Sequence, residues 1–305
     1  MPVLLEPVLK GLRISKDGTY VDGTFGRGGH SSAILQALGK GGRLIAIDRD
    51  PAAIAAAPEI LRQDTRFELI RGECAELEDY MDERALAGKV DGILLDLGVS
   101  SPQLDEAERG FSFLRDGPLD MRMDPDRGIS AAAWLAEVSE SDLRRALQQF
   151  GEEKMASRIA RTIVRARERA PLTRTLQLAE LVAGAVPAKM RAQRKHPATK
   201  TFQAIRIVVN AELEQLQAVL EQSLRVLKKG GRLCVISFHS LEDRIVKRFM
   251  RDHSREPEQY RGMPVIPPEF QPLLTLVGRA VVADSDELEL NIRSRSARLR
   301  IAERN

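Results

Sequence analysis

The segment from Tyr20 to His30, Tyr-Val-Asp-Gly-Thr-Phe-Gly-Arg-Gly-Gly-His, constrains the fold of this chain more than any other. A short β-prone run ends at Asp22, a glycine-rich turn follows, and Ser31 to Leu38 is typical of a helix capped by Ser31 or Ser32. A strand, a glycine turn and a helix in this order bring a ligand against backbone N–H groups at the helix N-terminus. The segment therefore predicts an α/β domain with a cofactor site at this turn. An ordinary tight βα turn is the alternative.

The order of residues in this turn indicates the chemistry of the ligand. A dinucleotide fingerprint spaces its glycines G-x-G-x-x-G, whereas here Asp22 precedes the turn and Gly28 and Gly29 are adjacent. A carboxylate in the turn repels a pyrophosphate and attracts a cationic ligand. S-adenosyl-L-methionine carries a sulfonium and an ammonium group, so we expect it to bind at Asp22, Gly26, Gly28 and Gly29. A nicotinamide-dependent (NAD) dehydrogenase remains the alternative, because it would share the strand, the turn and a later acid.

Two further acids end predicted strands. The run Arg43 to Asp48 is a buried strand by its apolar pattern, and Asp48 falls twenty positions after Gly28, the spacing of an acid that binds ribose hydroxyls. The run Val90 to Leu97 is another strand, with Asp96 near its end. Because the carboxyl ends of parallel strands meet at one edge of a sheet, these acids should share a crevice with Asp22.

The alternation of strands and helices stops after Leu104 and resumes near Lys200. Residues 105–200 contain helical periods, among them an arginine-rich segment from Glu152 to Arg169 whose charges are more often a solvated face than a binding face. After them we expect a long helix over Phe202 to Leu227, a strand over Arg232 to Phe238, and closing strands over Leu273 to Val282 and Ala297 to Glu303. We therefore predict a discontinuous α/β domain, residues 1–104 and 201–305, with an all-helical insertion, residues 105–200, that recognises RNA.

The net charge is only +3, so any nucleic-acid surface must be local. The segment Ala188 to Lys200 is the best candidate for phosphate contacts, because it has several cations and no acid: Lys189, Arg191, Arg194, Lys195 and Lys200. The alternative is that these cations are merely solvated.

The cysteines and the hydropathy pattern limit the class of protein. Cys74 and Cys234 are far apart and belong to no Cys/His cluster, which argues for a reducing compartment and against a bound metal. Neither a membrane-length apolar run nor a signal-peptide pattern is present in the sequence. We therefore expect a cytoplasmic protein that does not contact a membrane.

Several longer motifs allow a family to be named. Residues 22–30 resemble the first motif of class I S-adenosylmethionine methyltransferases, whose fold is Rossmann-like. Over essentially the whole chain the sequence resembles the bacterial small-subunit (16S) ribosomal RNA cytosine-N4 methyltransferases. The runs that carry this resemblance are Leu95 to Asp105, Arg109 to Phe113, Asp116 to Asp124, Lys195 to Ala204, Val235 to Arg244 and Arg293 to Ala297.

The resemblance implies a function and a set of site residues. The cofactor contacts would fall on Gly28, Gly29, His30, Asp48, Cys74, Asp96 and Gln103. The reaction would transfer a methyl group to N4 of a cytidine in the decoding region, and the carboxylate or loop that orients the amine would come from Asp96, Ser100 and Ser101. His196 and His239 lie in the resembling runs and are added to the substrate contacts.

We expect the partner to be small-subunit ribosomal RNA in an assembled or assembling 30S subunit, and the protein to be a monomer or a homodimer. A ribosome-assembly factor without catalytic activity is the alternative. Such a factor would keep the basic insertion but would not need the cofactor acids.

Overall fold

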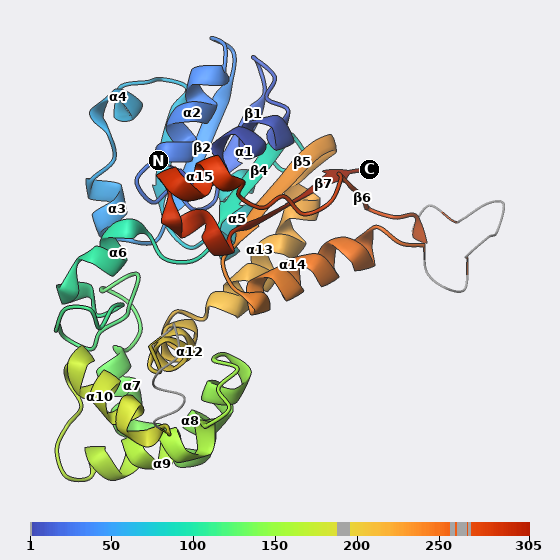
Figure 1. Ribbon diagram of the computed structural model, residues 1–305. Coiled ribbons are helices and arrows are strands. Elements are labelled where there is room, and N and C mark those ends of the chain that lie inside the picture. Colours follow the sequence, from blue (N-terminus) through green and yellow to red (C-terminus); the bar gives the residue numbers. More distant parts are fainter. Residues whose placement is uncertain (1, 188–195, 257–259, 261–266, 268–269) are drawn as a thin grey trace. The chain divides into compact units, whose positions relative to one another are not determined.

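The computed structural model describes residues 2–187, 196–256, 260, 267 and 270–305 (Figure 1). The chain divides into two compact units: residues 1–98 with 214–305, and residues 99–213. These limits differ by some residues from the predicted domain limits, 104/105 and 200/201. Each unit is described by itself below.

The first unit is built on a seven-stranded sheet in the order β3-β2-β1-β4-β5-β7-β6. Strands β1 to β5 are parallel to one another, and β7 pairs antiparallel with both β5 and β6. The strands are β1 (Thr19–Asp22), β2 (Arg43–Asp48), β3 (Phe67–Arg71), β4 (Val90–Asp96), β5 (Leu227–Ser237), β6 (Leu274–Leu276) and β7 (Arg298–Arg304). This is the predicted α/β fold, with Asp22, Asp48 and Asp96 as the last residues of β1, β2 and β4.

Helices cover both faces of this sheet, because successive side chains of a strand point to opposite faces. In β4, Ile93 and Leu95 belong to one buried cluster and Leu94 belongs to another. The first cluster includes residues of α5, α13 and α14, and the second includes residues of α1 and α2. Strands buried on both faces read as continuous apolar runs, which is why β2 and β4 could be predicted.

The helices of the first unit are mostly short, as Figure 1 shows. They are α1 (Leu5–Leu12), α2 (Gly29–Ala37), α3 (Pro51–Ala55), α4 (Glu59–Arg62), η1 (Cys74–Glu76), α5 (Leu77–Asp82), α13 (Glu212–Val226), whose first two residues belong to the second unit, α14 (Ser240–His253), α15 (Ser285–Leu290) and η5 (Ile292–Ser296).

The second unit is helical and has its own apolar core. Its helices are α6 (Ser101–Asp105), η2 (Ala107–Arg109), α7 (Ala131–Glu137), α8 (Glu140–Gln149), α9 (Ala156–Arg167), α10 (Thr175–Ala185) and α12 (Thr199–Asn210). The loop between η2 and α7 is ordered because Phe111, Leu119 and Met121 are buried in this core.

One helix prediction was wrong. Residues 202–227 form no single helix, because α12 ends at Asn210, and Ala211 adopts a left-handed conformation with φ of 47°. The Asn210 side chain is buried at the break, donating to the Met121 carbonyl at 2.7 Å and accepting from the Met123 N–H at 2.8 Å. A side chain used in this way fixes the end of the helix against the loop.

Among the residues that the structure describes, no helix has both the length and the apolar composition needed to span a bilayer.

Candidate active site

The glycine turn of the first unit is tied to the two neighbouring strands. The Gly23 N–H donates to the Leu94 carbonyl at 2.9 Å, and the Phe25 N–H donates to the Ile47 carbonyl at 3.0 Å. Gly26 and Gly28 have φ of 56° and 71°, a region that side chains other than glycine rarely adopt. Helix α2 begins at Gly29 with Gly28 as its N-cap, so the predicted cap at Ser31 or Ser32 was wrong.

Asp22 is the buried centre of this turn, with 1% of the residue exposed. It accepts from the Ser31 hydroxyl at 2.7 Å and from the Thr24 N–H at 3.1 Å. Burial raises the pKa of Asp22 above its ordinary value, and these hydrogen bonds oppose the increase. The Ser31 hydroxyl therefore donates its hydrogen bond to Asp22 and does not cap the helix.

Asp48 contacts the turn through one of its oxygens and the N-cap of α3 through the other. Oδ2 accepts from the Gly26 N–H at 2.7 Å, and Oδ1 accepts from the Asp50 N–H at 2.8 Å. Burial raises the pKa of Asp48 to about 6. Each oxygen keeps a second lone pair, so the carboxylate can still accept a hydrogen bond from a ligand hydroxyl.

Of the three strand-end acids, Asp96 has the fewest hydrogen-bond partners for its carboxyl group among the described residues. Its N–H donates to the Thr24 hydroxyl at 2.6 Å, which links β4 to the turn. Within the described chain, Oδ1 is buried with no hydrogen-bond partner, although 24% of the side chain is exposed. Burial raises the pKa of Asp96 well above its ordinary value, and the charges of Asp22 and Glu242 add to the increase. An unpartnered buried oxygen is rare in proteins and calls for a ligand or a role.

His30 is buried beside Asp96, its Nδ1 lying 3.4 Å from Asp96 Oδ2 and its Nε2 lying 3.0 Å from the Val3 carbonyl oxygen. Gly29 lies under the same N-terminal segment, because a Cβ there would be 2.7 Å from Pro2 Cγ. Packing against Pro2 is therefore a reason for glycine at position 29 that does not depend on a cofactor.

Cys74 and His239 complete the predicted residues of the first unit. Cys74 lies close to the turn, since a Cβ at Gly23 would be 3.9 Å from Cys74 Cβ. Burial raises the pKa of the Cys74 thiol to about 11. His239 is the N-cap of α14 at the carboxyl end of β5, where its Nε2 lies 3.1 Å from Glu242 Oε1.

The other predicted residues belong to the second unit. Ser100 precedes α6, Ser101 begins it, and the buried Gln103 accepts from the Ser100 N–H at 2.9 Å. The His196 ring lies 4.6 Å from the Phe113 ring, and Lys200 Nζ donates to the Glu152 carbonyl at 2.8 Å. Lys189, Arg191, Arg194 and Lys195 lie outside the described residues.

Residues 1–305 match the sequence model of the MraW methylase family. The chain belongs to this family. Methylases of this kind use S-adenosylmethionine as the methyl donor, which agrees with the cationic ligand predicted from the turn.

Solved structures resemble the chain at low identity. A putative rRNA-methylase from Clostridium thermocellum is 12% identical with a TM-score of 0.46, and the match covers 100% of this chain and 99% of that one. An rRNA methylase from Streptococcus thermophilus is 12% identical with a TM-score of 0.41, covering 98% and 93%. A putative methyltransferase from Streptococcus mutans in complex with SAH is 12% identical with a TM-score of 0.41, covering 100% and 99%. The family assignment rests on the sequence model.

The residues at the carboxyl edge of the sheet fit S-adenosylmethionine. Asp22, Asp48 and Asp96 place three carboxyl groups around the turn. Burial raises the pKa values of all three, and a bound cation would favour their ionised forms. A Cβ at Gly26 would meet no atom closer than the Thr24 carbonyl oxygen, 4.0 Å away, so the turn is open there.

Sequence reasoning missed the roles of Thr24, Ser31 and Glu242, which contact or act electrostatically on these acids. It also missed Val3, which contacts His30, and Glu287, which accepts from the Leu4 N–H. Thr24 and Ser31 lie within the motif and could have been proposed as polar partners of Asp22. The contacts of Val3 and Glu287 join distant parts of the sequence and leave no local signal.

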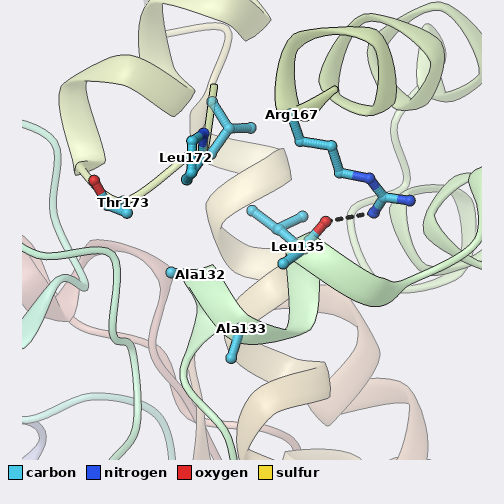
Figure 2. Close-up of a pocket in the computed structure, with 8 residues that line it drawn as sticks. Ala132, Ala133, Leu135, Arg167, Leu172 and Thr173 are labelled. Carbon is cyan, nitrogen blue, oxygen red and sulfur yellow. Dashed lines mark hydrogen bonds between the residues drawn. The ribbon is translucent and has the colours of Figure 1, made fainter. Parts of the chain in front are cut away.

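A separate pocket of about 320 Å³ lies in the second unit and contains none of the predicted site residues. Figure 2 shows the Arg167 guanidinium at this pocket, donating to the Leu135 carbonyl. Most of its other lining residues are alanine, leucine and proline. A hollow with this lining lacks the carboxylates expected around a sulfonium cofactor, so the sheet edge remains the candidate active site.

Proposed function

We propose that this methylase transfers a methyl group from S-adenosylmethionine to the exocyclic N4 of a cytidine in small-subunit ribosomal RNA. The observation that carries the proposal is Asp96, a partly exposed carboxyl group at the end of β4, one oxygen of which has no hydrogen-bond partner among the described residues. It is joined through Thr24 to the turn that we assign to the cofactor. The RNA substrate and its decoding region come from the sequence motifs described above.

Each acid has a separate role in this proposal. Asp48 binds the ribose hydroxyls with its remaining lone pairs, and Asp22 keeps the turn negative toward the cationic part of the cofactor. Gly26 leaves open space for the ligand before the start of α2, whereas an added Cβ at Gly28 or Gly29 would meet Phe25 or Pro2. Gly28 and Gly29 keep the cofactor contacts that the family resemblance gives them, as predictions. Cys74 borders the same site. Ser100, Ser101 and Gln103 keep the roles that the family resemblance gives them, as predictions.

The chemistry explains why a carboxyl group is needed. The cytosine N4 lone pair is delocalised into the ring, so the amine is a weak nucleophile, and S-adenosylmethionine supplies a methyl group that is already activated. Asp96 accepts a hydrogen bond from N4–H and so holds the amine in the geometry that localises its lone pair. Orientation of this kind can supply several kcal/mol of rate enhancement. Extruding the base costs a few kcal/mol, less when the target is already in a loop.

The cysteines argue against methylation at C5 of the same base, which requires a thiolate to attack the ring. The sequence has two cysteines, Cys74 and Cys234. Cys234 is fully buried in β5, and burial raises its pKa to about 12. The Cys74 thiol is also kept neutral at physiological pH by a raised pKa. An amine acceptor therefore fits this site better than a carbon acceptor.

Mass spectrometry of small-subunit ribosomal RNA tests the proposal in cells. RNA from cells that lack the protein should lose one methyl group on one cytidine. Wild-type protein should restore it, and the Asp96→Asn variant should restore much less. A methylation pattern that does not change when the protein is removed would reject the proposal and leave a non-catalytic assembly role.

A further inference from the structure

The His30 ring is held between the N-terminal segment and Asp96. Nε2 lies 3.0 Å from the Val3 carbonyl oxygen, Nδ1 lies 3.4 Å from Asp96 Oδ2, and only 6% of the residue is exposed. A carbonyl oxygen can only accept a hydrogen bond, so Nε2 carries the proton. The neutral ring then has its basic lone pair at Nδ1, which faces the Asp96 carboxyl group.

The Val3 carbonyl is fixed in this position by contacts on either side of it. The Leu4 N–H donates to Glu287 Oε1 on α15 at 2.6 Å, and Val3 and Leu4 are both buried. Leu4 has φ of 52°, a left-handed conformation that is unfavourable for a residue with a side chain. Such a conformation persists only where the surroundings enforce it. The N-terminal segment therefore sets the tautomer of His30 as a built feature of the fold.

We propose that His30 is a positioning residue that lets Asp96 act as the proton acceptor of the methyl-transfer reaction. This inference rests on the proposed function. As the bond from N4 to the methyl carbon forms and the bond from that carbon to sulfur breaks, N4 gains a positive charge and must lose one proton. Asp96 takes this proton, and the pair holds it between Asp96 Oδ2 and His30 Nδ1. After product release the proton passes to solvent, and the pair returns to its starting charge.

The acidic groups around Asp96 and His30 favour the protonated state of this pair. Asp22 on β1 and Glu287 on α15 act on His30, and Asp22 and Glu242 on α14 act on Asp96. Burial lowers the pKa of His30 and raises the pKa of Asp96, so the resting imidazole is neutral and Asp96 holds protons tightly. Binding of a cationic cofactor favours the ionised carboxylate, which makes the pair ready to accept a proton.

The His30→Gln variant separates this role from a packing role. A glutamine amide can still donate to the Val3 carbonyl, but it offers no basic nitrogen to Asp96. We expect the single-turnover rate of methyl transfer at saturating cofactor to fall about tenfold, less than the ~10²–10⁴-fold that a positioned acid–base group contributes. The wild-type rate should rise with pH as the pair loses its proton. This rise should move to lower pH in the variant, because the protonated pair loses its stabilising nitrogen.

The His253→Gln variant is the matched control, because its ring packs against Phe249 on α14 and is not near Asp96 in the contacts of the described residues. It should keep the wild-type rate and pH profile. A His30→Gln variant with the wild-type pH profile would overturn the inference while leaving the proposed function intact. Wild-type protein that forms no N4-methylcytidine would instead overturn the proposed function.

Nitrogen NMR of the cofactor-free chain gives a readout that needs no activity. The sequence has four histidines, so the His30 signal is the one that persists in each of the variants His196→Gln, His239→Gln and His253→Gln. We expect a neutral ring protonated at Nε2, whose titration shifts in Asp96→Asn. A titration that Asp96→Asn leaves unchanged would overturn the coupling, even if His30→Gln failed to fold.

Discussion

At the scale of single residues, the three strand-end acids differ in how many of their oxygens the protein already uses. Asp22 and Asp48 each accept hydrogen bonds on both oxygens, whereas Asp96 Oδ1 has no partner within the described chain. The first two therefore hold the turn and present a charge, and Asp96 is the acid most able to form a new hydrogen bond to a substrate.

Asp96→Asn tests whether this acid serves chemistry or cofactor binding. The amide keeps the shape and an acceptor oxygen but loses the charge. We expect the single-turnover rate to fall by about tenfold or more at saturating cofactor, with a smaller loss of cofactor affinity, because a contact made in the transition state lowers kcat and kcat/KM together. A variant as fast as the wild type, with a raised KM for S-adenosylmethionine, would leave Asp96 as a binding residue only.

Asp48 predicts a pH dependence of stability. Its folded pKa of about 6 lies above the ordinary value of 3.8, so the folded chain binds the proton more tightly than the unfolded chain does. The corresponding stability is present at low pH and is lost as pH rises from about 4 to about 6. Since one pKa unit corresponds to about 1.4 kcal/mol, the loss is at most about 3 kcal/mol.

Denaturant unfolding of the cofactor-free protein between pH 4 and pH 7 checks this expectation. The free energy of unfolding should fall less steeply with pH in Asp48→Asn than in the wild type. The variant should be less stable than the wild type at low pH, since an amide has one oxygen for the two N–H groups of Gly26 and Asp50, and this difference should narrow as pH rises. Parallel curves for the two proteins would contradict the raised pKa.

At the scale of elements, the strands of the first unit were predictable and several helix limits were not. Strands β2 and β4 are buried on both faces, so their residues form apolar runs that identify them, and their terminal acids follow directly. The end of α12 depends on Asn210, whose partners lie almost ninety residues earlier in the chain. The cap of α2 depends on Ser31 being used by Asp22. Both are tertiary contacts that local propensity does not contain.

Two glycines of the second unit give a prediction about backbone conformation. Gly184 lies in α10 and Gly128 in a turn with φ of 67°, and an added Cβ would meet no atom within 4 Å at either. Gly184→Ala should raise the free energy of unfolding by about 0.5–1 kcal/mol, because it restricts the unfolded chain and favours the helix. Gly128→Ala should lower it by about 1–2 kcal/mol, because alanine is strained at positive φ. Equal effects in thermal or denaturant unfolding would contradict this reasoning.

At the scale of the whole molecule, the chain combines a unit with the acidic turn and a unit that we propose for RNA recognition. The acids could be predicted because each ends a strand. The N-terminal contacts of His30 and Glu287 could not, because they join residues far apart in sequence. The cations at positions 189, 191, 194 and 195 lie outside the described residues, so their role remains a prediction from composition.

Replacing Lys189, Arg191, Arg194 and Lys195 together by alanine tests that role. RNA or subunit binding should weaken while S-adenosylmethionine affinity stays unchanged. The slope of log affinity against log salt should become shallower by about 0.7 for each lost contact to single-stranded phosphate. A quadruple replacement of the exposed Arg158, Arg161 and Arg165 on α9 and Arg169 just after it controls for net charge. An unaltered slope in the first variant would mean that its cations are merely solvated.

The position of a newly added methyl group tests the central claim most directly. Purified protein would be incubated with isotopically labelled S-adenosylmethionine and small subunits that lack the modification, and the nucleosides would then be separated by mass spectrometry. We predict labelled N4-methylcytidine, formed by the wild type and formed much more slowly by Asp96→Asn. Label on C5 of cytosine, on a ribose hydroxyl, or on no nucleoside would contradict the proposed function.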